Sequence, residues 1–204
     1  MERGKLIILE GAEEVSKTSV GRELCKIMNE NGKETIFTFQ PGDSAYAPHA
    51  PFIRALCKDK RYNLHELSQM YAFLLDRSEQ CDKIIKPALE AGINVISDRW
   101  SYSTYAYQLY GKGLKKKYNL PDSICDHLGE RAILGIDPDI TFYFTEKVGN
   151  RENDKHDAFD HETELFFGRV NKAYDRLAKY YHWVKPEIGN SAIETAKWIF
   201  DYLS

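Results

Sequence analysis

The chain has 204 residues, of which 43% are hydrophobic and 29% charged, and its formal net charge is −3. This mixture is typical of a globular protein and excludes wholesale disorder and a collagen-like fibre. A negative net charge argues against a general nucleic-acid binder, because such proteins neutralise phosphates with many Lys and Arg side chains. No apolar run approaches the ~20 residues that span a membrane, and the first six residues hold too short an apolar core for a signal peptide. The four cysteines are widely spaced, as is typical of reduced thiols in the cytosol. From these observations together we expect a soluble cytoplasmic protein with one domain over residues 1–204.

Short apolar runs alternate with longer amphipathic ones, a pattern typical of βαβ units around a parallel sheet. The expected fold class is therefore α/β. In chain order, buried strands are predicted at residues 6–10, 35–39, 94–97 and 141–145, with a short edge strand at 183–185. Helices are predicted at residues 17–31, 64–91, 162–181 and 192–203, and Pro87 is expected to kink or interrupt the second of them.

The loop after the first predicted strand has most residues of a phosphate-binding loop. Its sequence from Gly11 to Thr18 is GAEEVSKT, and the pattern is G-x-x-x-x-G-K followed by Ser or Thr, between a strand and a helix. Ser16 stands at the second glycine position. In such loops backbone N–H groups hold phosphate at a helix N-terminus, while the Lys reaches the outer phosphates and the hydroxyl binds Mg²⁺. An ordinary helix start is the alternative. The predicted ATP-binding residues are Gly11, Glu14, Val15, Ser16, Lys17, Thr18 and Ser19.

Two further pairs of residues suggest ligand contacts. Asp98 and Arg99 follow the predicted strand at 94–97, and ligands bind at the carboxyl ends of strands in open α/β sheets. Asp98 is predicted to hold Mg²⁺ together with Thr18, and Arg99 to clamp phosphate oxygens; a structural Asp–Arg pair is the alternative. Phe73 and Arg77 lie four residues apart on one predicted helix face, where a ring and a guanidinium would recognise a base.

Taken together, these segments resemble the thymidylate kinases, a family of P-loop nucleoside monophosphate kinases. The resemblance rests on five stretches in the family's order. They are residues 8–11 with the following loop, 38–43 (TFQPGD, similar to T-R-E-P-G-G), 73–77 (FLLDR), 96–108, and 157–160 (DAFD, similar to D-R-F-E). The resemblance implies a three-layer α/β/α P-loop kinase fold with a short mobile lid at about residues 146–161. It also implies a homodimer that phosphorylates dTMP to dTDP with ATP and Mg²⁺, without a nucleic-acid or membrane partner.

The resemblance also implies roles for single residues in binding the acceptor nucleotide. Phe73 would stack on thymine. Arg77 would donate a hydrogen bond to the exocyclic oxygen of thymine, which would reject cytosine because its amino group is itself a donor. Glu13 would lie near the sugar 3′-hydroxyl, and Tyr107 would pack where a ribose 2′-hydroxyl would clash. The other residues expected to contact the acceptor, through its phosphate or its base, are Phe39, Arg54, Arg99, Ser103, Thr104 and Gln108.

Three departures from the family pattern affect the predicted chemistry. Phe39 stands where the family usually has Arg, Ser16 replaces a loop glycine, and Ala158 replaces the lid arginine. Because a transition-state arginine accelerates some phosphoryl transfers by about 10³–10⁵-fold, we hypothesise that Arg151 takes its place. A dTMP kinase is the favoured function. A kinase for another or modified deoxynucleoside monophosphate, and a nucleotide-binding homologue with little turnover, remain alternatives. The predicted catalytic residues are Lys17, Asp98, Arg99 and Arg151.

Overall fold

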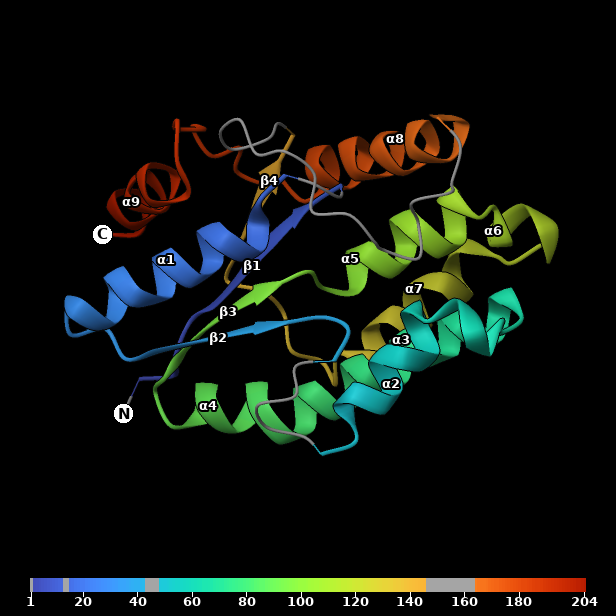
Figure 1. The fold of residues 1–204 in the computed structure, drawn as a ribbon, viewed down its shortest axis with the longest axis horizontal. Helices are drawn as coiled ribbons and strands as arrows, with labels where there is room; N and C mark the ends of the chain where they lie inside the picture. The colour runs from blue at the N-terminus through green and yellow to red at the C-terminus, as the bar shows by residue number, and fades with distance from the viewer. Residues whose placement is uncertain (1, 13–14, 43–47, 146–163) are drawn as a thin grey trace.

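The computed structural model describes residues 2–12, 15–42, 48–145 and 164–204. Its centre is a sheet of four parallel strands in the order β2-β3-β1-β4 (Figure 1). In the register of the sheet, Asp98 lies beside Leu9 on one side and Phe39 on the other. Because all strands run the same way, their carboxyl ends meet at one edge of the sheet, where ligands bind in folds of this kind. The strands are β1 (Leu6–Gly11), β2 (Thr35–Phe39), β3 (Asn94–Asp98) and β4 (Ile140–Phe144).

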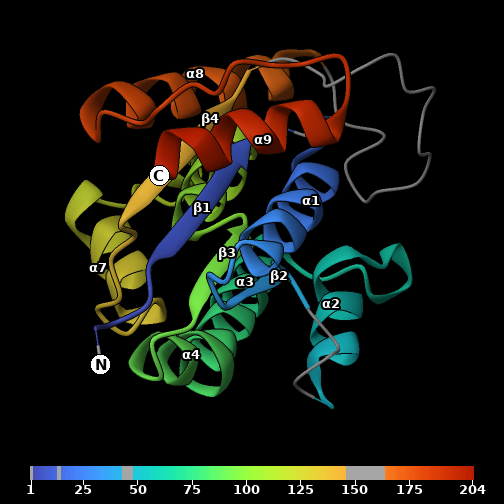
Figure 2. The same cartoon turned by 90° about the vertical axis from the view of Figure 1, so that its left-hand side faces the viewer.

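One face of the sheet is covered by α1 (Lys17–Glu30) and α9 (Ala192–Leu203), which lie side by side (Figure 2). The apolar side chains of α1 recur every fourth residue at Val20, Leu24 and Met28, and all three are buried. This spacing places them on one stripe of the helix, where they pack against β1 and α9. Burial of this stripe therefore holds the helix that follows the phosphate loop against the sheet.

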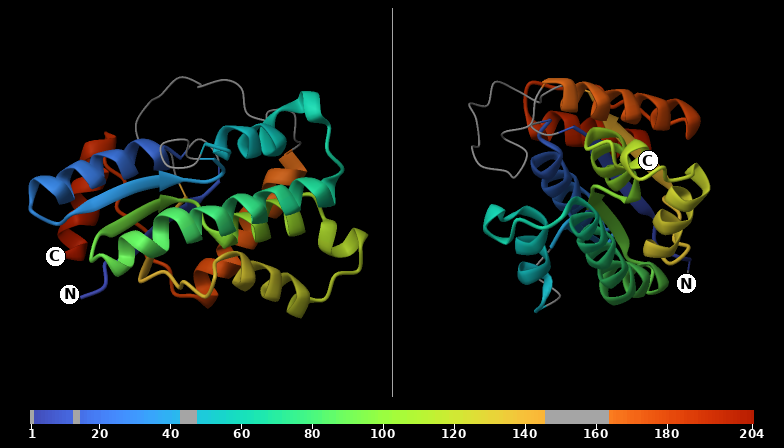
Figure 3. Two further views of the ribbon diagram at one scale, coloured as in Figure 1. Left: turned by 90° about the horizontal axis from the view of Figure 1, so that it is seen from below. Right: turned by 90° about the vertical axis from the view of Figure 1, so that its right-hand side faces the viewer.

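The opposite face is covered by α3 (Glu66–Gln80), the π-helical segment η2 (Cys81–Ile85) and α4 (Lys86–Glu90). Figure 3 shows these three segments as one nearly continuous rod along the sheet. A further layer beside β4 contains α8 (Glu164–Tyr180) and the π-helical η3 (Tyr105–Gly111). The other helices are α2 (Ala50–Lys58), η1 (Lys60–Tyr62), α5 (Ser101–Thr104), α6 (Leu114–Lys117) and α7 (Asp122–Ala132).

The predicted α/β/α arrangement and its four strands are confirmed, with strand ends that differ by no more than one residue. The predicted helix at 64–91 is present as α3, η2 and α4, which follow one another without a gap. Pro87 lies in the first turn of α4, and the irregularity takes the form of the π-helical η2 directly before it. The predicted strand at 183–185 is wrong as a strand: within the described part of the chain, Val184 forms only an isolated bridge with Phe142. In the described part of the chain, no helix combines the length and apolarity that crossing a membrane requires.

Candidate active site

The described residues at the two ends of the segment between β1 and α1 have features that suit a phosphate-binding loop. Gly11 ends β1 at φ +146°, and a Cβ atom there would lie 2.4 Å from the carbonyl oxygen of Phe144, so only glycine fits. Ser16 adopts the left-handed region with φ 58° and ψ 20° immediately before α1. Lys17 begins α1 with a buried side chain, and its Nζ donates a 2.5 Å hydrogen bond to the Ala12 carbonyl. The Lys17 ammonium thus points back over the loop, where phosphate oxygens would be reached.

The two residues predicted to bind Mg²⁺, Thr18 and Asp98, lie at the start of α1 and at the end of β3. The Thr18 hydroxyl donates a hydrogen bond to Oδ2 of Asp98. The other carboxylate oxygen, Oδ1, is buried without a hydrogen-bond partner among the described residues. One hydroxyl and one carboxylate suit Mg²⁺, which takes few protein ligands and keeps waters and substrate phosphates around it. The described residues contain no group of three or more His, Cys, Asp and Glu side chains suited to a metal ion.

Arg99 lies directly after β3 and is held from several sides. Its backbone is in the left-handed region at φ 78°. Nη1 donates to the Gly11 carbonyl, to Oγ of Ser103 and to the Tyr174 hydroxyl, each at 3.2 Å. Nη2 donates to the Tyr107 hydroxyl at 3.4 Å, and the guanidinium lies 5.0 Å from the centre of that ring. Arg99 is therefore fixed between the phosphate loop and η3.

A buried carboxylate supports this arrangement. Glu10 accepts hydrogen bonds from the Trp100 backbone N–H at 2.8 Å, from Ser103 Oγ at 2.8 Å and from the Tyr174 hydroxyl at 2.9 Å. Burial raises the pKa of Glu10, although the nearby Arg99 charge opposes this. The sequence motifs did not single out Glu10 as a site residue. Its position next to Gly11 at the end of β1 is the signal that could have identified it.

A cleft between α3, η3 and the segment after β2 brings the predicted acceptor residues together. It contains about 400 Å³ of free space, counting the part open to solvent. The predicted residues that line it are Phe73, Arg77, Arg99, Ser103, Thr104, Tyr107 and Gln108. Residues that the sequence motifs did not assign to the site also line it: Gln40, Pro41, Lys58 and Asp76. Gln40, Pro41 and Asp76 lie inside the family-like stretches, whereas no motif contains Lys58.

Arg77 is the most deeply buried cation of the cleft, at 2% exposure. Its Nε donates a 2.8 Å hydrogen bond to Oε1 of Gln40, and Nη1 donates a 2.7 Å bond to Oγ1 of Thr104. Burial lowers the pKa of Arg77. The neighbouring Asp76 accepts from the Gly42 backbone N–H at 2.7 Å, and burial raises the pKa of this carboxyl to about 6.

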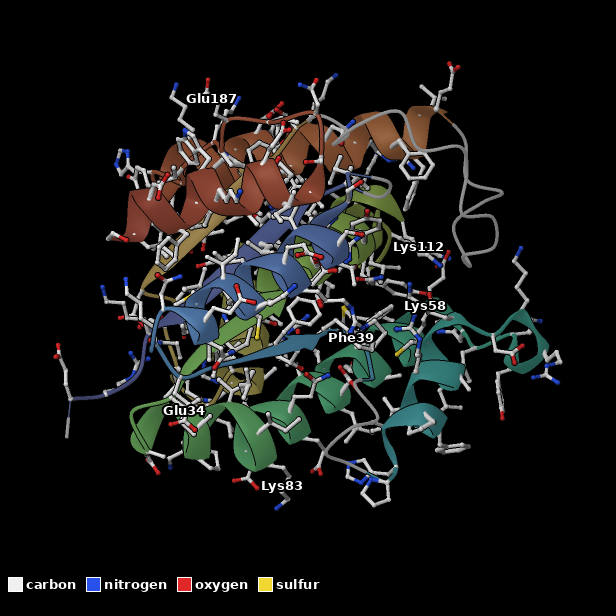
Figure 4. The ribbon with its side chains drawn as sticks, turned by 60° about the vertical axis from the view of Figure 1, so that its left-hand side comes forward. Glu34, Phe39, Lys58, Lys83, Lys112 and Glu187 are labelled. Carbon is white, nitrogen blue, oxygen red and sulfur yellow. The ribbon has the colours of Figure 1, made fainter. Side chains whose placement is uncertain are left out.

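Phe39 and Arg54 lie beside the cleft and are not among the residues that line it. The Arg54 guanidinium lies 5.5 Å from the centre of the Phe39 ring and donates a 2.6 Å hydrogen bond to the Pro41 carbonyl. Figure 4 marks Phe39 at the carboxyl end of β2 and Lys58 in α2. Phe39, which stands where the family usually has an arginine, therefore contacts the guanidinium of Arg54 with its ring.

Other predicted site residues contribute differently or cannot be placed. Val15 packs into the core between the sheet and α1, so only its backbone faces the loop, and Ser19 lies in the first turn of α1. Glu13, Glu14, Arg151 and the predicted lid at 146–161 lie outside the described residues.

Comparison with known proteins agrees with this geometry. The sequence model of the family described as thymidylate kinase matches residues 9–197. A thymidylate kinase from Nitrosomonas eutropha is 34% identical over 186 residues, which cover 89% of this chain and 82% of that protein. One from Dichelobacter nodosus is 33% identical, covering 88% and 87%. The crystal structure of thymidylate kinase from Ehrlichia chaffeensis superposes with a TM-score of 0.76 at 25% identity, over 99% of this chain and 100% of that one. The chain belongs to the thymidylate kinase family.

Proposed function

We propose that this chain transfers the γ-phosphoryl group of ATP to dTMP, forming ADP and dTDP. The observation that carries the proposal is one cleft in which Phe73, Arg77 and Arg99 converge beside the phosphate loop. Phe73 offers a ring for stacking, and Arg77 offers a buried donor for a base carbonyl. Arg99 contacts the Gly11 carbonyl, so it lies between the loop that would hold the donor and the cleft that would hold the acceptor.

The acceptor phosphate is already a nucleophile. The protein therefore accelerates phosphoryl transfer mainly by positioning the two nucleotides and by neutralising the charge of their phosphates. Lys17 would hold the outer phosphates of ATP, and Arg99 would hold the acceptor phosphate in line with them. Thr18 and Asp98 would hold Mg²⁺, which neutralises phosphate charge when bound. Glu13 at the sugar, and Arg151 in place of the lid arginine, complete the proposal. Full activity of an Arg151→Ala variant would remove that last assignment.

The same family membership supports three further proposals. We propose that the chain uses ATP and Mg²⁺, forms a homodimer and acts in the cytoplasm. A kinase for another or modified deoxynucleoside monophosphate is the second candidate, because Phe39 in place of arginine alters the acceptor side.

A coupled assay of ADP release tests the proposal, with ATP, Mg²⁺ and each of dTMP, dUMP, dCMP, dGMP and dAMP. We expect selective turnover of dTMP and a fall of about 10²–10³-fold in kcat for Lys17→Ala, the size that loss of one transition-state contact produces. Lys26→Ala is the matched control, since Lys26 lies exposed on the same helix. Preference for another monophosphate would favour the second candidate. ATP binding without transfer to any acceptor would contradict kinase activity.

A further inference from the structure

Tyr174 lies on the stripe of α8 that is buried against η3 and β4. The sequence motifs did not single it out. Its side chain is 0% exposed, and its ring packs beside those of Tyr107 and Tyr143. Burying a phenol is unfavourable unless its hydroxyl is hydrogen-bonded, so the partners of this hydroxyl show what the side chain does.

The Tyr174 hydroxyl lies between a buried carboxylate and a guanidinium. It donates to Oε2 of Glu10 at 2.9 Å and lies 3.2 Å from Nη1 of Arg99. A guanidinium can only donate, so the hydroxyl accepts from Arg99 while it gives its own proton to Glu10. Hydrogen bonds to charged groups are about twice as strong as bonds between neutral groups, and this hydroxyl makes one on each side. It therefore links Arg99 to the end of β1.

Ser103 makes the same two contacts from α5. Its Oγ donates to Oε2 of Glu10 at 2.8 Å and accepts from Nη1 of Arg99 at 3.2 Å. The Gly11 carbonyl is a third acceptor for Nη1, so this nitrogen is held from β1, α5 and α8. Arg99 lines the acceptor cleft, whereas Tyr174 and Glu10 do not. An effect of Tyr174 on a nucleotide in the cleft would therefore pass through Arg99.

The neighbouring Tyr143 shows that packing alone does not direct a tyrosine hydroxyl toward Arg99. Its ring centre lies 5.9 Å from that of Tyr174, and both rings belong to one buried cluster. The Tyr143 hydroxyl nevertheless donates to Asp175 at 3.0 Å. The contact with Arg99 is thus a property of Tyr174 and not of the aromatic cluster as a whole.

We propose that Tyr174 is a positioning residue for the acceptor phosphate: its hydroxyl, oriented by Glu10, holds the guanidinium of Arg99 in the direction in which it clamps that phosphate. The inference rests on the proposed function and deepens it. An arginine side chain loses considerable rotamer freedom when it is ordered, and ordering it before the nucleotide arrives removes that cost from binding. A misplacement of about 1 Å in such a group can slow a reaction about 100-fold.

Calorimetry with dTMP and thymidine tests the proposal, because the two ligands differ only in the phosphate. Tyr174→Phe keeps the ring and removes the hydroxyl. We expect this variant to bind dTMP about tenfold more weakly, the size of one charge-assisted hydrogen bond, and to bind thymidine as the wild type does. Tyr143→Phe is the matched control, since it removes a hydroxyl of the same cluster that donates to Asp175 instead. It should bind both ligands like the wild type.

A double-mutant cycle shows whether Tyr174 acts through Arg99. Arg99→Met removes the guanidinium and should itself weaken the binding of dTMP. Adding Tyr174→Phe to Arg99→Met should then cause no further loss. A merely structural role of Tyr174 predicts the same loss in both backgrounds and for both ligands. That result would overturn the proposal, and so would a Tyr174→Phe variant with the wild-type ratio of the two affinities.

Thermal melting checks that Tyr174→Phe folds. If it does not, Glu10→Gln replaces it. An amide has only one acceptor oxygen, whereas the Trp100 N–H and the hydroxyls of Ser103 and Tyr174 use both oxygens of Glu10. The Tyr174 hydroxyl would then lose its orientation, and an unchanged ratio of the dTMP and thymidine affinities in Glu10→Gln overturns the proposal equally.

Binding does not require turnover, which separates this inference from the proposed function. A wild type that binds dTMP more tightly than thymidine and transfers no phosphate contradicts only the kinase activity. A wild type that transfers phosphate to dTMP, beside a Tyr174→Phe variant with an unchanged ratio of affinities, contradicts only the role of Tyr174.

Discussion

Thr18, in the first turn of α1, donates its hydroxyl hydrogen bond to Asp98, the last residue of β3. This bond joins the helix that follows β1 to the end of the neighbouring strand β3. The second oxygen of Asp98 is buried and without a hydrogen-bond partner in the described part of the chain, so the capacity of this oxygen to accept a bond is not used by those residues.

Removing the charge of Asp98 should weaken the use of Mg²⁺. Asp98→Asn retains the shape of the side chain and loses the anionic oxygen, and we expect the Mg²⁺ concentration for half-maximal rate to rise by about 10–100-fold, the range for altered metal-site groups. Steady-state rates over a Mg²⁺ series measure this. Asp201→Asn, on the exposed side of α9, should leave the Mg²⁺ dependence unchanged. An Asp98→Asn enzyme with the wild-type dependence would show that the carboxylate does not contact the metal.

Glycine at position 16 should stabilise the loop. The left-handed backbone of Ser16 costs an L-residue about 1–2 kcal/mol, and glycine avoids that cost at the expense of about 0.5–1 kcal/mol of chain entropy. Ser16→Gly should therefore raise the free energy of unfolding by about 0.5 kcal/mol and strengthen ATP binding. Ser68→Gly in the exposed first turn of α3 should instead lower the free energy of unfolding by about 0.5 kcal/mol, since glycine has the lower helix propensity. Urea unfolding measures the free energy of unfolding of both variants. If Ser16→Gly destabilised the protein as much as Ser68→Gly does, the backbone of Ser16 would not be strained.

Lys58 should contribute to binding the acceptor phosphate. It lines the cleft from the last turn of α2, and Phe39 removes a cation that family members place nearby. We expect Lys58→Ala to weaken dTMP binding by about tenfold, the strength of one charge-assisted hydrogen bond, with little effect on thymidine, which lacks the phosphate. Calorimetry with both ligands measures the difference, and Lys83→Ala, away from the cleft and paired with Asp82, is the control. Equal losses for both ligands would mean that Lys58 only shapes the cleft.

The stability of the protein should depend on the ionisation of Asp76. Burial raises the pKa of this carboxyl from 3.8 to about 6, so the folded protein keeps a proton that the unfolded chain has already lost. The free energy of unfolding therefore falls as the pH rises from about 4 to about 6, by up to about 3 kcal/mol from this group.

Asp76→Asn cannot ionise and should remove that contribution. Relative to the wild type, we expect its free energy of unfolding to increase by up to about 3 kcal/mol between pH 4 and pH 7, measured by urea unfolding at several pH values. Asp201→Asn gives the baseline for an exposed carboxylate. A difference between Asp76→Asn and the wild type that does not change with pH would contradict the raised pKa.

The four strands could be predicted because their signals are local: each is a short apolar run that is contiguous in the sequence. The residues GAEEVSKT after β1 are also contiguous, and their role in binding phosphate stays a prediction. The acceptor cleft is different, because Gln40, Lys58 and Asp76 come from three elements and meet only through packing. Helices between residues 101 and 132 were not predicted either. α5 and α6 have only four residues each and η3 is π-helical, so their apolar residues do not show the period of an α-helix over several turns. The eleven-residue α7 was missed as well.

The strand order has a consequence for how the chain folds while it is being made. β1 is synthesised first, yet its two neighbours in the sheet are β3 and β4, whose residues follow at 94–98 and 140–144. On a ribosome, the run LIIL of β1 therefore emerges long before either partner strand exists. Until residue 144 has left the exit tunnel, at least one edge of β1 stays open, and exposed apolar strand edges associate with other chains. We therefore expect the nascent amino-terminal part of this protein to be most prone to such association before β4 has emerged.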